Sequence, residues 1–181
     1  MEDNFVDAPF RKHLRLRQYD YSQAGCYFIT ICAQHRRKIL GRIVGGDDHI
    51  APFSRSAKAE ILRLSGYGEC VDRYINSFEA HYKNVSVDKY VIMPNHVHLI
   101  IKVAEEYGAP RSSRPTDALI PKIIAALKTM VNREVGRPIW QSSYYDHIIR
   151  DEADYLTKWD YIDANPARWA EDEYYIAENS R

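Results

Sequence analysis

The chain has 181 residues with 25 basic and 25 acidic side chains, so its formal net charge is zero and a uniformly basic nucleic-acid binder is excluded. Its length fits one domain with a substantial core, and no apolar run reaches the roughly 18 residues of a membrane span. The acidic N-terminus lacks a signal-peptide core, and three cysteines without metal-type spacing suit a reducing compartment, so we expect a cytoplasmic protein.

Turn residues divide the first half of the chain into short apolar segments. In chain order the pattern predicts a strand at 25–33 and a short apolar stretch at 39–44. A helix is then predicted to start after Ser54 or Ser56, to carry Ile61 and Leu62 and to break near 66–68. A helical segment at 71–80 and a strand at 85–92 follow.

The segment VIMPNHVHLIIKV, residues 91–103, predicts the turn and the second strand of a central β-hairpin. Met93-Pro94-Asn95 is typical of a tight turn, because proline presets φ and asparagine tolerates unusual backbone angles. Side chains alternate along the returning strand, so His96 and His98 lie on one face. The other face is uniformly apolar and is the predicted core face, with Val97, Leu99, Ile101 and Val103.

The second half of the chain begins with a polar segment that contains two prolines. The predicted elements are a loop at 105–117, a helix at 119–131, a strand at 140–150 and a long helix from Asp151 to Asn165. Strands and helices alternate around a central hairpin. We therefore predict an α+β fold in which helices pack on an antiparallel sheet.

Two imidazoles on one strand face form a compact pair of metal ligands. In an arbitrary sequence, such a pair more often consists of two half-exposed histidines on a polar sheet face. A histidine-triad nucleotide hydrolase would need a third histidine two residues after His98, where this chain has Ile100. Two imidazoles alone bind a metal weakly, so a third ligand must come from another element.

The final predicted helix offers that ligand. Its core stripe, at helical spacing, is formed by Tyr155, Leu156, Trp159 and Ile162. Tyr161 lies off this stripe and shares another face with Asp154, Lys158 and Asn165. A plainer interpretation makes Tyr161 an amphipathic residue at the margin of the core and Asn165 a helix stop before Pro166.

Charge is distributed unevenly along the chain. The region 11–38 holds one acid and seven basic residues, which are interleaved with tyrosines and comprise Arg11, Lys12, Arg15, Arg17, Arg36, Arg37 and Lys38. Cations that meet phosphates and rings that stack on unpaired bases are what a nucleic-acid surface uses. The alternative is a solvated loop with ordinary surface charge, and the pattern alone does not exclude it.

Taken together, these segments resemble a known family. MPNHVHLI, WQSSYYDHIIR and YIDANP, in this order and spacing, are similar to motifs of the single-tyrosine HUH (His–hydrophobic–His) transposases. More narrowly, they resemble the REP-associated tyrosine transposases and their insertion-sequence relatives, and GCYFITICAQHRR is similar to the first strand of that family. The resemblance covers about 15–166 of a single domain at 1–181, in which 167–181 is an acidic C-terminal tail.

The resemblance implies that His96 and His98 bind a metal, that Tyr161 is the nucleophile and that Asn165 completes the metal site. It also implies an RRM-like or ferredoxin-like antiparallel sheet and cleavage of single-stranded DNA beside a hairpin, in DNA transposition or in REP-element processing. The cation would be Mg²⁺ or Mn²⁺, and the nitrogen-rich ligand set makes Mn²⁺ at least as suitable. Such a protein would be cytoplasmic and act at the nucleoid.

Other residues compete for these roles. Tyr144 and Tyr145 neighbour Asp146 and His147, although alternation along a strand explains this segment equally well. Lys102 and Lys158 are candidate phosphate contacts, and Trp140 and Gln141 are interpreted as structural.

Two alternative functions stay open: a domesticated nucleic-acid-hairpin-binding protein without turnover, and a metal-dependent phosphohydrolase for small substrates. The connection before the final helix is very short, so the helix can reach only nearby surface. We therefore expect a monomer, with Tyr161 acting in its own chain, rather than a homodimer.

Overall fold

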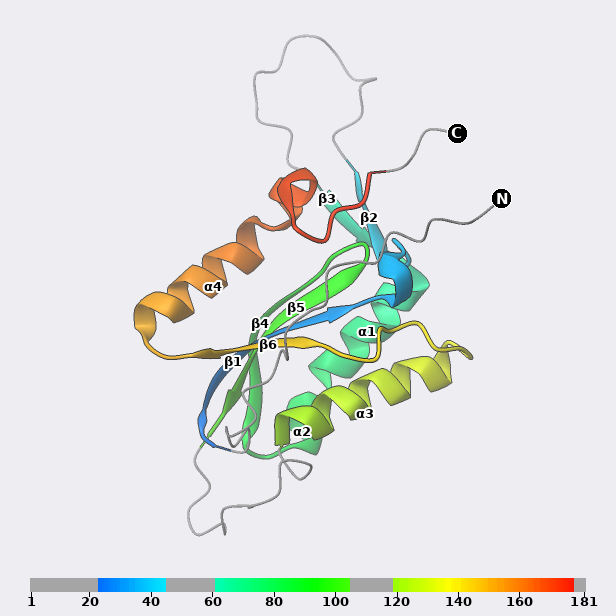
Figure 1. Ribbon diagram of the computed structural model, residues 1–181. Helices are drawn as coiled ribbons and strands as arrows, with labels where there is room; N and C mark the ends of the chain where they lie inside the picture. Colours follow the sequence, from blue (N-terminus) through cyan, green and yellow to red (C-terminus); the bar gives the residue numbers. More distant parts are fainter. Residues whose placement is uncertain (1–22, 45–60, 105–118, 178–181) are drawn as a thin grey trace, which may run out of the picture.

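The computed structural model describes residues 23–44, 61–104 and 119–177 (Figure 1). In chain order the elements are β1 (Gly25–Cys32), η1 (Gln34–Arg36), β2 (Gly41–Val44), β3 (Ile61–Leu64), α1 (Gly66–Asn76), α2 (Phe78–His81), β4 (Val85–Ile92), β5 (His96–Val103), α3 (Leu119–Glu134), β6 (Tyr145–Ile149), α4 (Glu152–Ala164) and η3 (Pro166–Glu171). No helix in these ranges is both long and apolar enough to cross a membrane.

A four-stranded sheet forms the centre of the molecule. Its strand order is β4-β5-β1-β6, and β1 pairs antiparallel with both β5 and β6. β4 and β5 form the predicted hairpin around Met93-Pro94-Asn95, with a register shift between Val87 and Lys89. Together with α1 and α3, these strands give the order strand–helix–strand–strand–helix–strand. The predicted α+β fold with a central antiparallel sheet is confirmed.

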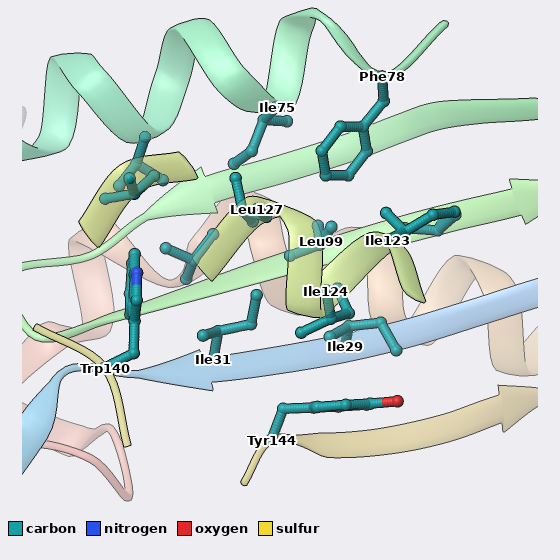
Figure 2. Packing of buried hydrophobic residues seen from close by; sticks show 14 of the residues in the cluster. Ile29, Ile31, Ile75, Phe78, Leu99, Ile123, Ile124, Leu127, Trp140 and Tyr144 are labelled. Atoms are coloured by element: carbon teal, nitrogen blue, oxygen red, sulfur yellow. The ribbon is translucent and has the colours of Figure 1, made fainter. Parts of the chain in front are cut away.

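The main core lies between one face of the sheet and helices α1, α2 and α3. Figure 2 shows Ile29 and Ile31 of β1 and Leu99 of β5 in this core, with Ile75 of α1 and Leu127 of α3. All five side chains are at most 2% exposed. The face of β5 that was predicted to be apolar is the one that packs here, as the alternation required.

Helix α4 packs against the opposite face of the sheet. Figure 1 shows it across the sheet from α1 and α3. A second, smaller core forms there between Phe28 of β1, Ile100 of β5 and Ile162 of α4, with Tyr155 and Trp159 partly buried against them. The predicted stripe of α4 is therefore correct except for Leu156, which is 51% exposed because it points away from the sheet.

The predicted helix around residues 54–65 is wrong where the structure describes it. Residues 61–64 form strand β3, which pairs with β2 in a separate two-stranded sheet, so that Leu64 lies opposite Gly41. Ser54 and Ser56 lie outside the described residues, as does the loop predicted at 105–117.

The predicted break near 66–68 is in fact the beginning of α1. The side chain of Ser65 caps this helix by accepting a hydrogen bond from the backbone N–H of Gly68 at 3.2 Å. Gly68 is required for another reason: a Cβ there would lie 2.0 Å from the carbonyl oxygen of Leu40. The glycine thus permits close approach of the helix to a neighbouring segment.

The strand predicted at 140–150 is shorter than expected. Regular pairing is confined to β6, while Trp140 forms one isolated bridge with Ala33 and buries its indole in the main core. The backbone N–H of Gln141 donates to the carbonyl of Cys32 at 2.9 Å. The structural roles predicted for Trp140 and Gln141 agree with these contacts.

Candidate active site

Strand β5 places two imidazoles side by side on the sheet face toward α4. His96 and His98 pair with Cys32 and Thr30 of β1, and their ring centroids lie 4.4 Å apart. The two residues are 0% and 1% exposed. Their position at the start of β5, directly after the turn, brings them to one end of the sheet.

Each imidazole is held through its Nδ1 atom. Nδ1 of His98 lies 2.8 Å from the hydroxyl of Thr30, and Nδ1 of His96 lies 2.8 Å from Oδ1 of Asn95. Asn95 donates through Nδ2 to the carbonyl oxygens of Tyr174 and Arg36, which leaves its Oδ1 as the acceptor for His96. His96 therefore carries its proton on Nδ1 and has a free electron pair on Nε2.

The Nε2 atoms of both histidines are buried and have no hydrogen-bond partner among the described residues. Burial lowers the pKa of His96 to about 4, against a smaller opposing effect of the Asp172 carboxylate. Burial also holds the pKa of His98 well below its usual value, and the neighbouring His96 and Lys158 charges add to this. Both rings are thus neutral near pH 7, which is the form that binds metals.

The carboxylate of Asp172 lies close to the two imidazoles. A ligand nitrogen of each histidine and a carboxylate oxygen of Asp172 all lie within 4.8 Å of one another. The carboxylate accepts hydrogen bonds from Nδ2 of Asn165 at 2.7 Å and from the backbone N–H of Tyr174 at 2.7 Å. The donor set of these three side chains fits a divalent cation.

Sequence reasoning missed Asp172, because it treated 167–181 as an acidic tail. Two large aromatic residues in that segment, Trp169 and Tyr174, are a sequence feature that could have indicated its packing; they are 8% and 3% exposed. Both rings lie close to His96, with centroids at 6.0 and 4.7 Å. Buried aromatic residues indicate that the segment after Pro166 folds back on the domain instead of projecting into solvent.

Asn165, the predicted third ligand, is brought to the same place at the C-terminal end of α4. It is 3% exposed, and its Oδ1 is a third buried atom without a hydrogen-bond partner among the described residues. Because its Nδ2 donates to Asp172, its Oδ1 must point elsewhere. The amide is therefore compatible with the predicted ligand role.

Tyr161 lies one turn before Asn165 on α4. Its ring centroid is 5.1 Å from that of His98, and its hydroxyl donates to Oδ2 of Asp172 at 3.1 Å. Partial burial raises the pKa of Tyr161 far above its usual value, and the Asp172 carboxylate raises it further. The hydroxyl is thus held as a neutral phenol whose proton points at a carboxylate.

The neighbouring tyrosines take other roles. Tyr144 is 6% exposed and packs in the main core, while Tyr145 is 37% exposed on the opposite face of β6. His147 pairs through Nε2 with the Asp154 carboxylate at 2.8 Å, so it joins β6 to α4 and activates neither phenol.

The predicted DNA-contacting cations are dispersed. Lys158 approaches the site, with Nζ 5.3 Å from the centre of the Phe28 ring. The Arg36 guanidinium lies 5.2 Å from the centre of the Tyr174 ring, and Lys38 Nζ lies 5.2 Å from that of Tyr175. Lys102 is exposed, four residues beyond His98 along β5 and thus roughly 13 Å away. Arg37 is also exposed, and the remaining predicted cations, Arg11, Lys12, Arg15 and Arg17, lie outside the described residues.

A cavity of about 720 Å³ adjoins these residues. Its wall includes Phe28 and His98 of the sheet, Tyr161 of α4 and residues 171–174. A second cavity, of about 490 Å³, shares Tyr161, Glu171 and Asp172 with the first and also includes Asn165 and Arg168 in its wall. Tyr161 is therefore part of the wall of both cavities.

Comparisons with known proteins find relatives of this chain. No family model matches the chain. An uncharacterised Haemophilus influenzae protein is 30% identical over 183 residues, which cover 92% of this chain and 93% of that protein. Another protein of this species, provisionally named a REP-associated tyrosine transposase, is 26% identical over 164 residues, 82% of this chain and 74% of that protein.

A solved structure has the same fold. It is described as a REP-associated tyrosine transposase bound to a REP hairpin, and it superposes with a TM-score of 0.59 at 19% identity. The superposition covers 88% of this chain and 76% of that one.

Proposed function

Given that the chain belongs to the family of REP-associated tyrosine transposases, we propose that it is a metal-dependent endonuclease and strand transferase for single-stranded DNA. The observation that carries this proposal is the convergence of two buried imidazole Nε2 atoms without partners and the hydroxyl of Tyr161 on the Asp172 carboxylate. The reaction forms a 5′-phosphotyrosine intermediate and belongs to DNA transposition or REP-element processing.

The metal ligands we propose are three buried atoms of this site that have no hydrogen-bond partner among the described residues: Nε2 of His96, Nε2 of His98 and Oδ1 of Asn165. Two nitrogens and one amide oxygen fit Mn²⁺ or Mg²⁺. When bound, such a cation neutralises charge that develops on the non-bridging oxygens of a phosphodiester. Asp172 already accepts three hydrogen bonds, from Asn165, Tyr161 and the Tyr174 N–H, so we assign it a different role.

That role is to take the proton of the nucleophile. The Tyr161 oxygen attacks phosphorus, its proton passes along the existing hydrogen bond to Oδ2 of Asp172, and a new O–P bond forms. The bond between phosphorus and the 3′ oxygen breaks, and this oxygen takes up a proton to become a free 3′-hydroxyl. The phosphotyrosine retains an activated phosphate, so attack by another 3′-hydroxyl reverses the step and joins strands without ATP.

The proposed substrate is single-stranded DNA next to a hairpin. A solved structure of the same fold is described as bound to a REP hairpin, and η1 contributes Arg36 beside the site. We also propose that the chain acts as a monomer with Tyr161 in cis. Tyr161 and His98 of one chain are in ring contact, which supports this arrangement.

Covalent trapping tests the proposed function. Incubation with single-stranded hairpin oligonucleotides and Mn²⁺ should give a protein–DNA adduct that survives a denaturing gel. Tyr161→Phe should abolish the adduct, because it removes the nucleophilic oxygen and keeps the ring. Tyr175→Phe is the matched control, since Tyr175 is similarly exposed but lines neither cavity. An adduct with Tyr161→Phe would refute the assignment of the nucleophile.

A further inference from the structure

The larger cavity beside Tyr161 has walls from strands β1, β5 and β6, from helix α4 and from residues 171–174. Helix α4 packs most extensively against β4 and β5, and it also contacts β1 through Phe28 and β6 through the His147–Asp154 pair. Phe28 of β1, which is 4% exposed, and Tyr145 of β6, which is 37% exposed, both line this cavity. Tyr161 borders it on the α4 side, so this space directly adjoins the nucleophile.

The aromatic side chains that line the larger cavity can stack on a flat ring. Phe28 already contacts two rings, with its centroid 5.2 Å from that of His98 and 6.0 Å from that of Tyr161. Tyr145 has no such ring contact among the described residues, and its exposed face can accept a nucleobase. The volume of about 720 Å³ is within the range of small-ligand sites.

The charges around the cavity favour a neutral group over a phosphate. Three carboxylates, those of residues 171–173, face one ammonium, that of Lys158. Glu171 lies 3.7 Å from Arg168 and Asp172 is bound to Tyr161, whereas Glu173 makes no side-chain ion pair within the described chain. A carboxylate accepts hydrogen bonds from the exocyclic amine of a base such as cytosine, and thymine has no such amine.

We propose that this cavity is a nucleobase subsite for the unpaired nucleotide next to the cleaved phosphate. Tyr145 stacks on the base, and Glu173 selects a base that carries an exocyclic amine. The subsite rests on the proposed function for its position relative to cleavage. It assigns to Tyr145 a positioning role and to Glu173 a role in specificity.

Binding to oligonucleotides tests the subsite separately from catalysis. Fluorescence anisotropy with labelled oligo(dC) and oligo(dT) of about 12 nucleotides, in the presence of Mn²⁺, is measured on Tyr161→Phe protein, which cannot be consumed by cleavage. We expect oligo(dC) to bind about fivefold more tightly than oligo(dT). An oligomer of the same length with abasic residues measures the contribution of the backbone alone.

Variants then assign the effect to residues. Tyr145→Ser should weaken oligo(dC) binding about tenfold and leave the abasic oligomer unchanged, while Tyr145→Phe retains the ring and should restore affinity. Glu173→Gln should reduce the preference for oligo(dC) over oligo(dT) to about twofold or less. Tyr67→Ser, on α1 at the opposite face of the sheet, is the control and should change neither oligomer.

Equal loss of oligo(dC) and abasic binding in Tyr145→Ser would overturn the subsite, because the ring would then act on the backbone. Unchanged oligo(dC) binding in that variant would also overturn it. A dC preference that depends on Tyr145 and Glu173 supports the subsite even where wild-type protein forms no covalent adduct. That combination would refute the proposed nuclease activity and leave base recognition standing.

Discussion

The hydroxyl of Tyr161 donates to Oδ2 of Asp172 at 3.1 Å, and this contact joins helix α4 to the segment that follows it. The same carboxylate oxygen accepts from Nδ2 of Asn165 at 2.7 Å. Three side chains that are 4, 7 and 11 residues apart along the chain thus meet at one oxygen atom. The nucleophile, its proton acceptor and a candidate metal ligand are consequently coupled.

Metal binding should distinguish Asn165 from Asp172. If Asn165 supplies the oxygen ligand, Asn165→Ala should weaken Mn²⁺ binding by about tenfold or more. Asp172→Asn should then change the Mn²⁺ affinity less, but should strongly reduce formation of the protein–DNA adduct. Isothermal titration with Mn²⁺ on both variants, with His98→Ala as the reference for a lost ligand, measures this. A larger loss of Mn²⁺ affinity in Asp172→Asn than in Asn165→Ala would instead make Asp172 the ligand, as its position within 4.8 Å of both histidines permits.

The state of Tyr161 should respond to the same carboxylate. Burial and the Asp172 charge raise the pKa of Tyr161, so replacing Asp172 by asparagine should lower that pKa toward the usual value of about 10. NMR of protein labelled at the tyrosine Cζ resolves the titration of this one phenol among the 14 tyrosines. Glu152→Gln, an exposed change at the opposite end of α4, is the control and should leave it unaltered.

The buried histidines make the stability of the metal-free protein dependent on pH. Burial lowers the pKa of His96 to about 4, so between about pH 6.5 and 4 the unfolded chain binds a proton that the folded chain excludes. The free energy of unfolding therefore falls as pH decreases through this window, by about 3 kcal/mol for this residue.

Urea denaturation with a chelator present, across pH 4 to 7, measures this loss. His96→Gln removes the titrating group, so the free energy of unfolding should fall by about 3 kcal/mol less between about pH 6.5 and 4 than in the wild type. An identical slope in the wild type and the variant would show that groups other than His96 determine the acid sensitivity.

The central hairpin and its histidines were predictable because the physical rule behind them is local. Alternation along β5 fixes which side chains share a face, and one uniformly apolar face decides which side is the core. Asn165 and Tyr161 follow from helical spacing in the same way. Family resemblance then supplied their chemical roles, which periodicity does not contain.

Asp172 and Gly68 could not be placed by such rules. Asp172 reaches the site because the chain reverses after α4 and buries Trp169 and Tyr174 against the domain, a contact between segments far apart in sequence. Gly66 and Gly68 were interpreted as a helix break, although Ser65 caps a helix that starts there. The need for glycine at 68 arises from the Leu40 backbone, which is distant in the sequence.

A pair of glycine substitutions tests that explanation. Gly68→Ala should destabilise the fold by about 3 kcal/mol or more, because its Cβ would lie 2.0 Å from the Leu40 carbonyl oxygen and backbone must move. Gly66→Ala, in the first turn of the same helix, meets nothing within 4 Å and should be neutral or stabilising by about 0.5 kcal/mol. Thermal unfolding of both variants provides the measurement, and equal effects would contradict the steric argument.

The last prediction concerns whether each active site is built from one chain. Asp151 caps α4 by accepting from the N–H of Asp154, and β6 ends only two residues earlier, so the connection is too short to carry the helix far. Contacts of the helix with its own sheet add to this restraint: His147 pairs with Asp154, and Tyr155 donates to Asp88 at 3.0 Å.

We therefore expect that His96→Ala and Tyr161→Phe proteins, each inactive alone, stay inactive when mixed. The readout is the covalent adduct with hairpin DNA and Mn²⁺, and the positive control is wild-type protein diluted into either variant. A helix exchanged between two chains would combine the intact histidines of one with the intact tyrosine of the other. Adduct formation in the mixture would therefore show a shared site and contradict action in cis.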